Sequence, residues 1–263
     1  MIRMKVFIAF AHPEPQSLTA SLRDVATSEL TALGHEVQVS DLYAMGWKSN
    51  IDRSDFPTLA PDERMRVPYA SGAAFLRGTL TDDVKAEQAK LLWADMMILQ
   101  FPLWWYSMPA ILKGWVERVY AAGFAYGVGV SDEHRGGDRY GEGVFAGKRA
   151  MLLVSVGGQP DNYSARGICG PIEDVLFPIN HGILYYPGFD VLPPFIVWGT
   201  DRLDAAGFET ASSALRDRMQ TLETIAPIPY RPLNGGDYAF PGMTLRPELG
   251  TADASGFRLH ERE

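Results

Sequence analysis

The sequence contains one cysteine, Cys169, among 263 residues. A single thiol allows neither an intrachain disulfide nor a thiolate zinc site, and it suits a reducing, cytoplasmic setting. The histidines also lack the spacing of metal ligands. They are His12, His35, His134, His181 and His260. We therefore expect no metal site.

Long uninterrupted hydrophobic runs are also absent. The run from Val6 to Ala11 is shorter than the ~7 to 15 residues of a secretory signal core. The stretch from Met96 to Val116 is apolar, but two prolines, Gln100 and Lys113 interrupt it. The sequence therefore predicts neither a signal peptide nor a membrane span.

An excess of positive charge is missing as well. The chain carries 24 Lys and Arg against 32 Asp and Glu, a formal net charge of −8. Nucleic acid and anionic membranes are therefore disfavoured as partners. The 46% hydrophobic and 21% charged content is that of an ordinary globular protein.

Several sequence motifs of nucleotide-binding proteins and hydrolases are absent. Gly127 and Gly129 have no third glycine in register after a strand, and the segment from Gly143 to Lys148 lacks the spacing of a triphosphate-binding loop. A G-x-S-x-G nucleophile turn does not occur either. These absences argue against a triphosphate-binding enzyme and against a serine hydrolase.

What the sequence does contain is a regular alternation of apolar strand-like runs and segments of helical periodicity. The expected strands are 4–10, 36–39, 96–101, 150–156 and 189–197. The expected helices are 18–33, 84–93, 109–119, 172–184 and 205–225. Strands that are apolar throughout are typical of a sheet buried on both faces. The prediction is an α/β protein, a three-layer sandwich with a parallel sheet and helices on both faces.

Two segments do not fit the alternation. Residues 41–79 and 227–263 are rich in proline, glycine and turn residues. We expect one domain over residues 1–226 with an insertion at 41–79, and a tail at 227–263 that packs on the domain or on a dimer partner.

Three strand ends carry unusual residues, and in an open parallel sheet the ligand crevice lies at the carboxyl ends of strands. The turn after the first strand leads to Ser17 at a helix N-terminus, where backbone N–H groups favour phosphate. Three aromatic residues from Trp104 to Tyr106 follow the third strand and offer a flat wall. Paired glycines from Gly157 follow the fourth. The structural alternatives are a plain helix cap, a core plug and a simple turn.

The chain resembles the dimeric flavin-dependent NAD(P)H:quinone oxidoreductases, the DT-diaphorase-like group, in four segments. They are AHPEPQSLTASL (11–22), QFPLWWYSMPAILKGWVERVYAAGFAYG (100–127), VGGQPDNYSARGICGP (156–171) and HGILYYPGF (181–189). The likeness runs in order from about residue 5 to residue 197, and the 127–147 segment is closer to bacterial members. It implies a flavodoxin-like fold, FAD at the crevice in preference to FMN, and a homodimer with its active sites at the interface.

The resemblance also implies roles for individual residues. The pyrophosphate and adenosine side of FAD would contact His12, Ser17, Leu18, Thr19 and Ser21. The isoalloxazine would contact Pro102, Leu103, Trp104, Trp105 and Tyr106. Its edge would be approached by Ser155, Val156, Gly157, Gly158 and Tyr163. The substrate pocket would be formed by Trp105, Tyr106, Tyr126, Val128, Asn162, Cys169 and Tyr186, with Tyr126 and Val128 coming from the partner subunit.

The implied reaction is a two-electron ping-pong hydride transfer, in which NAD(P)H reduces N5 of FAD and a quinone then takes its place. Gly157, Gly158 and Tyr163 are the catalytic candidates, and the Tyr163 phenol is suited to donate a hydrogen bond to the reduced ring. Animal members have a histidine where this chain has Cys169, and a thiol is a poorer base than histidine near neutral pH. We expect Tyr163 to act alone or with Arg166, with Cys169 mainly in a packing role.

Other functions remain compatible with the same residues. A nitro- or azo-aromatic reductase would use the same aromatic pocket. A flavin-binding regulatory subunit of a membrane transporter is an alternative of another class, and an FMN-dependent electron carrier is a third.

Overall fold

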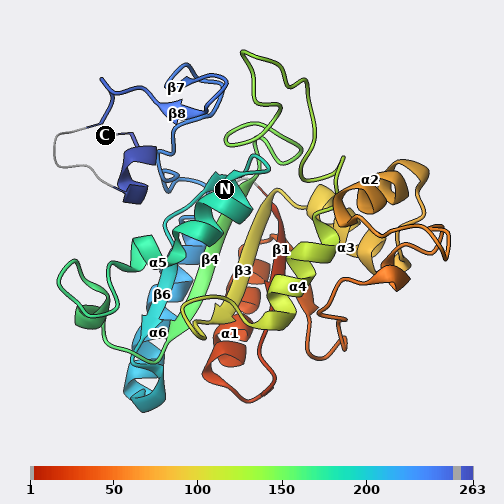
Figure 1. Cartoon of the computed structure of the whole chain (residues 1–263). Helices are drawn as coiled ribbons and strands as arrows, with labels where there is room; N and C mark the ends of the chain where they lie inside the picture. Colours follow the sequence, from red (N-terminus) through yellow and green to blue (C-terminus); the bar gives the residue numbers. More distant parts are fainter. Residues whose placement is uncertain (1–2, 251–255, 263) are drawn as a thin grey trace.

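The structure, a computed structural model, describes residues 3–250 and 256–262. Its main sheet contains β1 (Lys5–Phe10), β2 (Glu36–Asp41), β3 (Met96–Pro102), β4 (Arg149–Val156), β5 (Asp190–Val191) and β6 (Phe195–Trp198). Its α-helices are α1 (Leu18–Ala32), α2 (Val67–Arg77), α3 (Asp82–Trp93), α4 (Ala110–Val119), α5 (Ile172–Ile179) and α6 (Ala205–Gln220). Figure 1 shows the sheet between two layers of helices.

All pairings in this sheet are parallel, and the strand order is β2-β1-β3-β4-β5, with β6 also paired to β4. Alternate residues of β1 serve opposite cores: Val6 and Ile8 pack with α1 and α6, whereas Phe7 and Ala9 pack with α3, α4 and α5. A strand covered on both faces needs apolar side chains at every position. The predicted α/β sandwich with a parallel sheet is confirmed.

Two predicted elements are divided in the structure, and proline is the reason in both. The helix predicted over 205–225 is also shorter, ending at Gln220. The helix predicted to reach Leu184 is α-helical only to Ile179 and continues as a π-helical segment, η3 (Asn180–Tyr185), just after Pro178. Proline has no N–H for the intrahelical ladder. The strand predicted over 189–197 is divided into β5 and β6, because Pro193 and Pro194 interrupt the ladder.

The insertion at 41–79 is more ordered than its composition suggested. It contains α2, and it passes so close to α4 that a Cβ on Gly114 would lie 1.7 Å from the Ser49 carbonyl oxygen. Only glycine allows this approach of two backbones. The insertion is therefore packed tightly against the helical layer of the domain.

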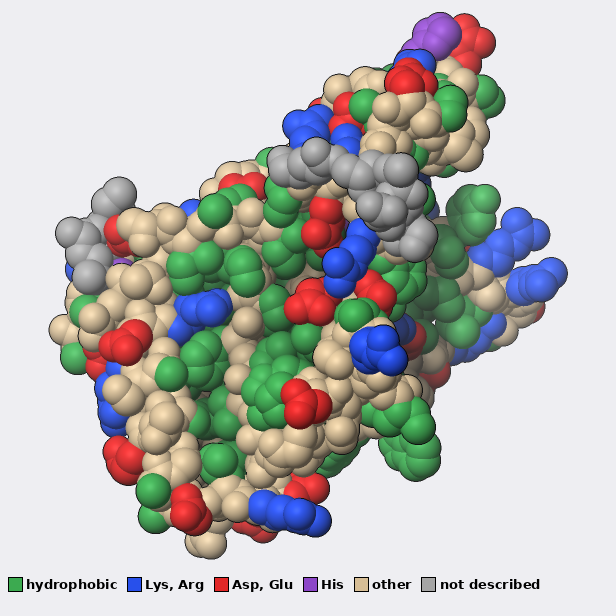
Figure 2. Space-filling model, turned by 90° about the vertical axis from the view of Figure 1, so that its left-hand side faces the viewer, with side chains coloured by type: hydrophobic (Ala, Val, Ile, Leu, Met, Phe, Trp, Pro, Cys, Tyr) green, Lys and Arg blue, Asp and Glu red, His purple; other side chains and the backbone are tan. Residues whose placement is uncertain are grey.

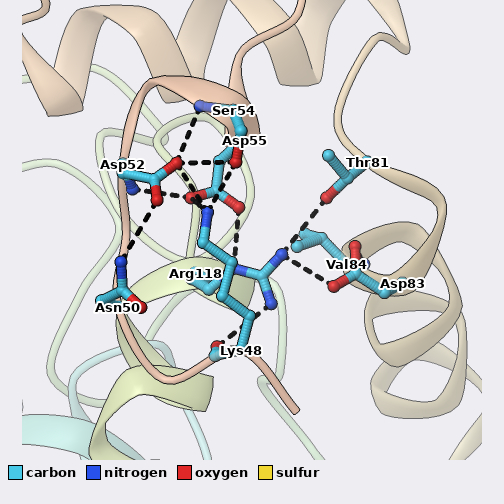
Figure 3. A network of polar contacts seen from close by, with 9 residues as sticks. All are labelled: Lys48, Asn50, Asp52, Ser54, Asp55, Thr81, Asp83, Val84 and Arg118. Carbon is cyan, nitrogen blue, oxygen red and sulfur yellow. Dashed lines mark hydrogen bonds and ion pairs between the residues drawn. The ribbon is translucent and has the colours of Figure 1, made fainter. Parts of the chain in front are cut away.

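A buried ion-pair network fixes the insertion to α3 and α4, as Figure 3 shows. The Arg118 Nε donates to Asp55 Oδ1 over 2.8 Å, and its Nη2 donates to Asp83 Oδ2 over 2.7 Å. The Lys48 Nζ also reaches Asp55 Oδ2 over 2.8 Å. The side chains of Arg118 and Asp55 are only 2% and 5% exposed. Burial acts to raise the pKa of Asp83, but hydrogen bonds from Thr81 and Arg118 outweigh it and lower the pKa.

The tail packs on η3 through aromatic rings. Phe257 stacks on Phe177 with ring centroids 4.2 Å apart, Phe177 stacks on His181 at 4.5 Å, and His181 stacks on Tyr140 at 4.7 Å. Tyr230 meets His181 edge-on at 5.0 Å. The tail also forms a short hairpin, β7 (Tyr238–Ala239) with β8 (Thr244–Leu245).

A further segment projects from the body between α4 and β4. Residues 127–142 rise above the sheet in Figure 1, near the β7–β8 hairpin, and the molecule carries a projection at the upper edge of Figure 2. Asn234 of the tail holds its base, because its Nδ2 donates to the Gly137 carbonyl and to Glu142 Oε2, each over 2.9 Å. Among residues 3–250 and 256–262, no helix has the length and apolar character needed to cross a membrane.

We predict that Arg118→Met lowers the free energy of unfolding by about 3 kcal/mol, because it leaves the buried Asp55 carboxylate with Lys48 alone and removes the partner of Asp83. Urea unfolding measures the loss. The control is Lys113→Met, which breaks an exposed pair with Glu117 on the same helix and is expected to cost less than about 1 kcal/mol. Equal, small losses in both variants would show that the network does not stabilise the fold.

The His181 stack gives a second prediction, on pH dependence. Burial, with a contribution from His260, lowers the pKa of His181 from 6.5 to about 4. Between these values the unfolded chain binds a proton that the native state does not, so stability falls as the pH is lowered through this window. The loss attributable to His181 is about 3 kcal/mol.

His181→Phe keeps a ring in the stack and is expected to remove this part of the acid destabilisation. The measurement is urea unfolding near pH 7 and near pH 4. His134→Phe is the control, since the His134 side chain is 84% exposed and should leave the pH dependence unchanged. An unaltered acid loss in His181→Phe would contradict the prediction.

Candidate active site

A cavity of 360 Å³ opens at the carboxyl ends of β1, β3, β4 and β6. It is lined by His12, Ser17, Leu18, Thr19, Pro102, Leu103, Trp104, Ser155, Gly157, Thr200 and Asp201. In the strand order observed here, β1 and β3 are the neighbours at which the sheet reverses its direction of growth. Open α/β sheets bind ligands at this position. A larger hollow of 610 Å³ lies on the insertion beside Tyr69 of α2, away from these strand ends.

The N-terminus of α1 forms one side of the cavity. The Ser17 hydroxyl accepts a hydrogen bond from the Ala20 N–H over 3.1 Å, so this side chain does cap the helix. The first helical N–H groups have no intrahelical partner, and Leu18 and Thr19 carry two of them at the cavity wall. The His12 Nδ1 accepts from the Glu14 N–H over 3.0 Å and so fixes the preceding turn. This side of the cavity is suited to an anionic group.

Buried side chains set the floor beneath this helix. The hydroxyls of Thr19 and Ser155 lie 2.7 Å apart, and the Gln100 Nε2 donates to the Thr19 carbonyl over 2.7 Å. All three residues are almost fully buried. These bonds join β3 and β4 to α1, so the phosphate-type turn keeps a fixed position relative to the sheet.

The aromatic residues after β3 form a tight turn. The N–H and carbonyl of Trp104 each bond to Ser107 over 3.0 Å, and the two central residues have positive φ angles, 49° for Trp105 and 60° for Tyr106. Turns of this primed type favour asparagine and glycine. Trp104 lines the cavity, whereas the Trp105 side chain is 97% exposed. The aromatic wall is therefore on the surface of this chain and not a plug in its core.

The paired glycines after β4 approach their neighbours closely. A Cβ on Gly157 would lie 2.7 Å from the Asp201 carboxylate, and one on Gly158 would lie 2.9 Å from the Tyr163 ring. Tyr163 also packs against Trp198, with ring centroids 5.4 Å apart. Burial first, and then Cys169, raise the pKa of Tyr163, so its phenol is protonated at neutral pH and available as a donor.

Other predicted site residues lie outside the lining of this cavity. Ser21 is on the second turn of α1, beside a groove shared with α6. Tyr126 has its hydroxyl 3.4 Å from the Ser71 hydroxyl of α2. Tyr186 packs edge-on against Tyr140 at 4.9 Å. Val128 lies in the projecting segment, Val156 is buried in β4, and Asn162 and Cys169 lie in the loop after Gly158. The lining also does not include Trp105, Tyr106, Gly158 or Tyr163.

Two cavity residues, Thr200 and Asp201, were not predicted. They follow β6, and they reach the cavity because β6 pairs with β4. The signal available in the sequence was their position directly after an expected strand end. The prediction treated residues 189–197 as a single strand. It therefore did not identify β6 as the strand whose carboxyl end reaches the cavity.

These features fit a flavin. The helix N-terminus suits phosphate, the aromatic turn presents a flat apolar surface, and glycine brings the backbone close to the space between them. The residues that would hold the ring are Pro102, Leu103, Trp104, Trp105, Tyr106, Gly157 and Gly158. The hydrogen-bonded floor leaves the Thr19 and Ser155 hydroxyls already satisfied by each other.

Comparison with known proteins places the chain in a family. The model of the family described as having a flavodoxin-like fold matches residues 4–221. The chain therefore belongs to this family. The structure shares its fold with the NAD(P)H:quinone oxidoreductase of Methanothermobacter marburgensis. The TM-score is 0.63 and the sequence identity is 24%.

Within this class, the chain is similar to proteins named as ribosyldihydronicotinamide and quinone dehydrogenases. The chain is 58% identical to the ribosyldihydronicotinamide dehydrogenase-like protein traD of Penicillium crustosum, over 98% of this chain and 96% of that protein. It is 37% identical to human ribosyldihydronicotinamide dehydrogenase [quinone], over 87% of this chain and 96% of the human protein. A crystal structure of a candidate quinone reductase from Klebsiella pneumoniae has a TM-score of 0.96 and 54% identity, covering 98% of this chain and 100% of that one. The resemblance found in the sequence is confirmed: the chain belongs to the quinone dehydrogenases of the flavodoxin-like fold.

Proposed function

We propose that this protein is a flavin-dependent NAD(P)H:quinone oxidoreductase. The observation that carries the proposal is the meeting of three features at one cavity: the N-terminus of α1, the aromatic turn after β3 and the glycine pair after β4. Each has a simpler structural explanation when it stands alone. Their convergence in a chain of the quinone dehydrogenase family favours a flavin enzyme.

We assign FAD in preference to FMN. The cavity is lined from the aromatic turn across β1 and β4 to Thr200 and Asp201 after β6. A lining that extends over four strand ends suits a cofactor longer than a ring with one phosphate. The Asp201 carboxylate adds an acceptor for sugar hydroxyls, while the N-terminus of α1 supplies donors for phosphate.

The chemistry of hydride acceptance and release belongs to the flavin, which the protein positions. The residues of this chain bind, orient and shield it. Trp104, Trp105 and Tyr106 supply a wall on which flat rings can stack, so that donor and acceptor occupy the same place in turn. The Tyr163 phenol stands beside Gly158 as a hydrogen-bond donor for negative charge that develops on the ring.

A homodimer is part of the proposal. Trp105 and Ile168 are each 97% exposed, so apolar side chains of the aromatic turn and of the loop that carries Cys169 stand without cover. Large exposed apolar residues near a site mark a contact surface. Tyr126, Val128 and Tyr186 lie away from the cavity of their own chain, as residues would that complete the pocket of a second copy. The proposed setting is cytoplasmic, with the single thiol reduced.

The proposal is tested by the visible absorption spectrum of the purified protein with FAD. Under anaerobic conditions the spectrum should bleach with NADPH, NADH or dihydronicotinamide riboside and return with menadione, and sedimentation should give a dimer. Comparing the three donors identifies the preferred one. A protein that binds no flavin would contradict the proposal, and one that binds flavin without turnover would favour a regulatory subunit.

Tyr163→Phe keeps the ring that packs on Gly158 and Trp198 but removes the donor. We predict that it lowers the rate of flavin reduction by up to ~10²-fold without abolishing flavin binding. Anaerobic stopped-flow absorbance measures the rate. Tyr69→Phe is the matched control, since Tyr69 is 73% exposed on α2 and outside the cavity. Reduction of Tyr163→Phe as fast as the wild type would exclude the donor role.

A further inference from the structure

The turn at Trp105 and Tyr106 is strained. Both residues adopt positive φ angles, a region that bulky residues rarely occupy because it is sterically unfavourable. Such a conformation persists only where surrounding contacts impose it. The Trp104–Ser107 backbone bonds close the turn, but they are compatible with smaller residues and do not explain what orients these two side chains.

One hydrogen bond holds a side chain of this turn. Trp105 is almost fully exposed, so little of its surface is in contact with this chain. The Tyr106 hydroxyl donates to the Cys169 Sγ over 3.5 Å. In the described part of the chain, this is the one hydrogen bond made by the side chain of either residue. This bond also raises the pKa of Tyr106.

Cys169 belongs to a loop that is itself rigid. Its backbone N–H donates to the Asn162 carbonyl over 2.9 Å, and a Cβ on Gly167 would lie 2.2 Å from the same oxygen. The loop therefore closes tightly on the segment that carries Tyr163. Cys169 also contributes to the raised pKa of Tyr163. The Tyr106–Cys169 bond thus connects the aromatic turn to the loop that follows Tyr163.

We propose that Cys169 is a positioning residue that holds Tyr106 in the strained turn and fixes the aromatic wall relative to Tyr163. The functional consequence of this inference rests on the proposed function, because the aromatic turn and Tyr163 flank the proposed flavin ring. It changes the role expected for Cys169, which was mainly packing at the substrate pocket. The link requires a hydroxyl at position 106 and a sulfur acceptor at position 169, and both are present in this chain.

The first test uses the thiol itself. Cys169 is the only cysteine of the chain, so reaction of the flavin-free protein with an aromatic disulfide reagent reports on this site alone. Tyr106→Phe keeps the ring and removes the donor. We expect the labelling rate to fall about three- to tenfold, because a hydrogen bond of about 1 kcal/mol donated to the sulfur stabilises the thiolate that attacks the reagent. Tyr69→Phe should label at the wild-type rate.

The second test is a double-mutant cycle on FAD binding, followed by flavin fluorescence. Tyr106→Phe and Cys169→Ala should each raise the dissociation constant of FAD about three- to tenfold. The double variant should be no weaker than either single variant, because one bond is lost in all three. Cys169→Ser retains an acceptor and should recover part of the affinity.

The outcomes separate this inference from the proposed function. Slower labelling in Tyr106→Phe of a protein that binds no flavin supports the link and contradicts the flavin enzyme. A wild-type protein that binds FAD and turns over, with unchanged labelling in Tyr106→Phe and additive effects in the cycle, overturns the link and leaves the enzyme assignment intact.

Discussion

The parallel arrangement of β1, β3 and β4 is the constraint on which the rest of this protein depends. Parallel strands place all their carboxyl ends on one edge of the sheet. The chain leaves β1 toward α1 on one face and leaves β3 toward α4 on the other. The two connections diverge there and leave a crevice between them. The helix N-terminus, the aromatic turn and the glycine pair are brought together by this geometry.

The segments outside the alternation are tied to the same framework by different forces. Arg118 holds the insertion through buried ion pairs whose partners would be costly to leave alone. The tail packs through stacked rings around His181, which keeps that histidine neutral at physiological pH because burial disfavours its charge. Both attachments use elements of the helical layer that contains α3, α4 and α5.

Strain and rigidity are distributed unevenly around the proposed site. The floor formed by Thr19, Gln100 and Ser155 is buried and hydrogen-bonded. The aromatic turn above it is exposed and occupies an unfavourable backbone region. Backbone strain of this kind is common at binding sites whose groups are already held in place for a ligand. A single contact from Tyr106 to Cys169 joins this turn to the loop that carries Tyr163.

The sequence by itself determined the sheet, because strands buried on both faces must be apolar at every position and so stand out from their surroundings. It also placed Ser17, Trp104 and Gly157 at strand ends, where local pattern suffices. Only the tertiary structure decided that Thr200 and Asp201 reach the cavity, that His181 is buried under the tail, and that Tyr106 meets Cys169. These contacts join residues far apart in the chain, so they cannot be predicted from local periodicity or turn preference.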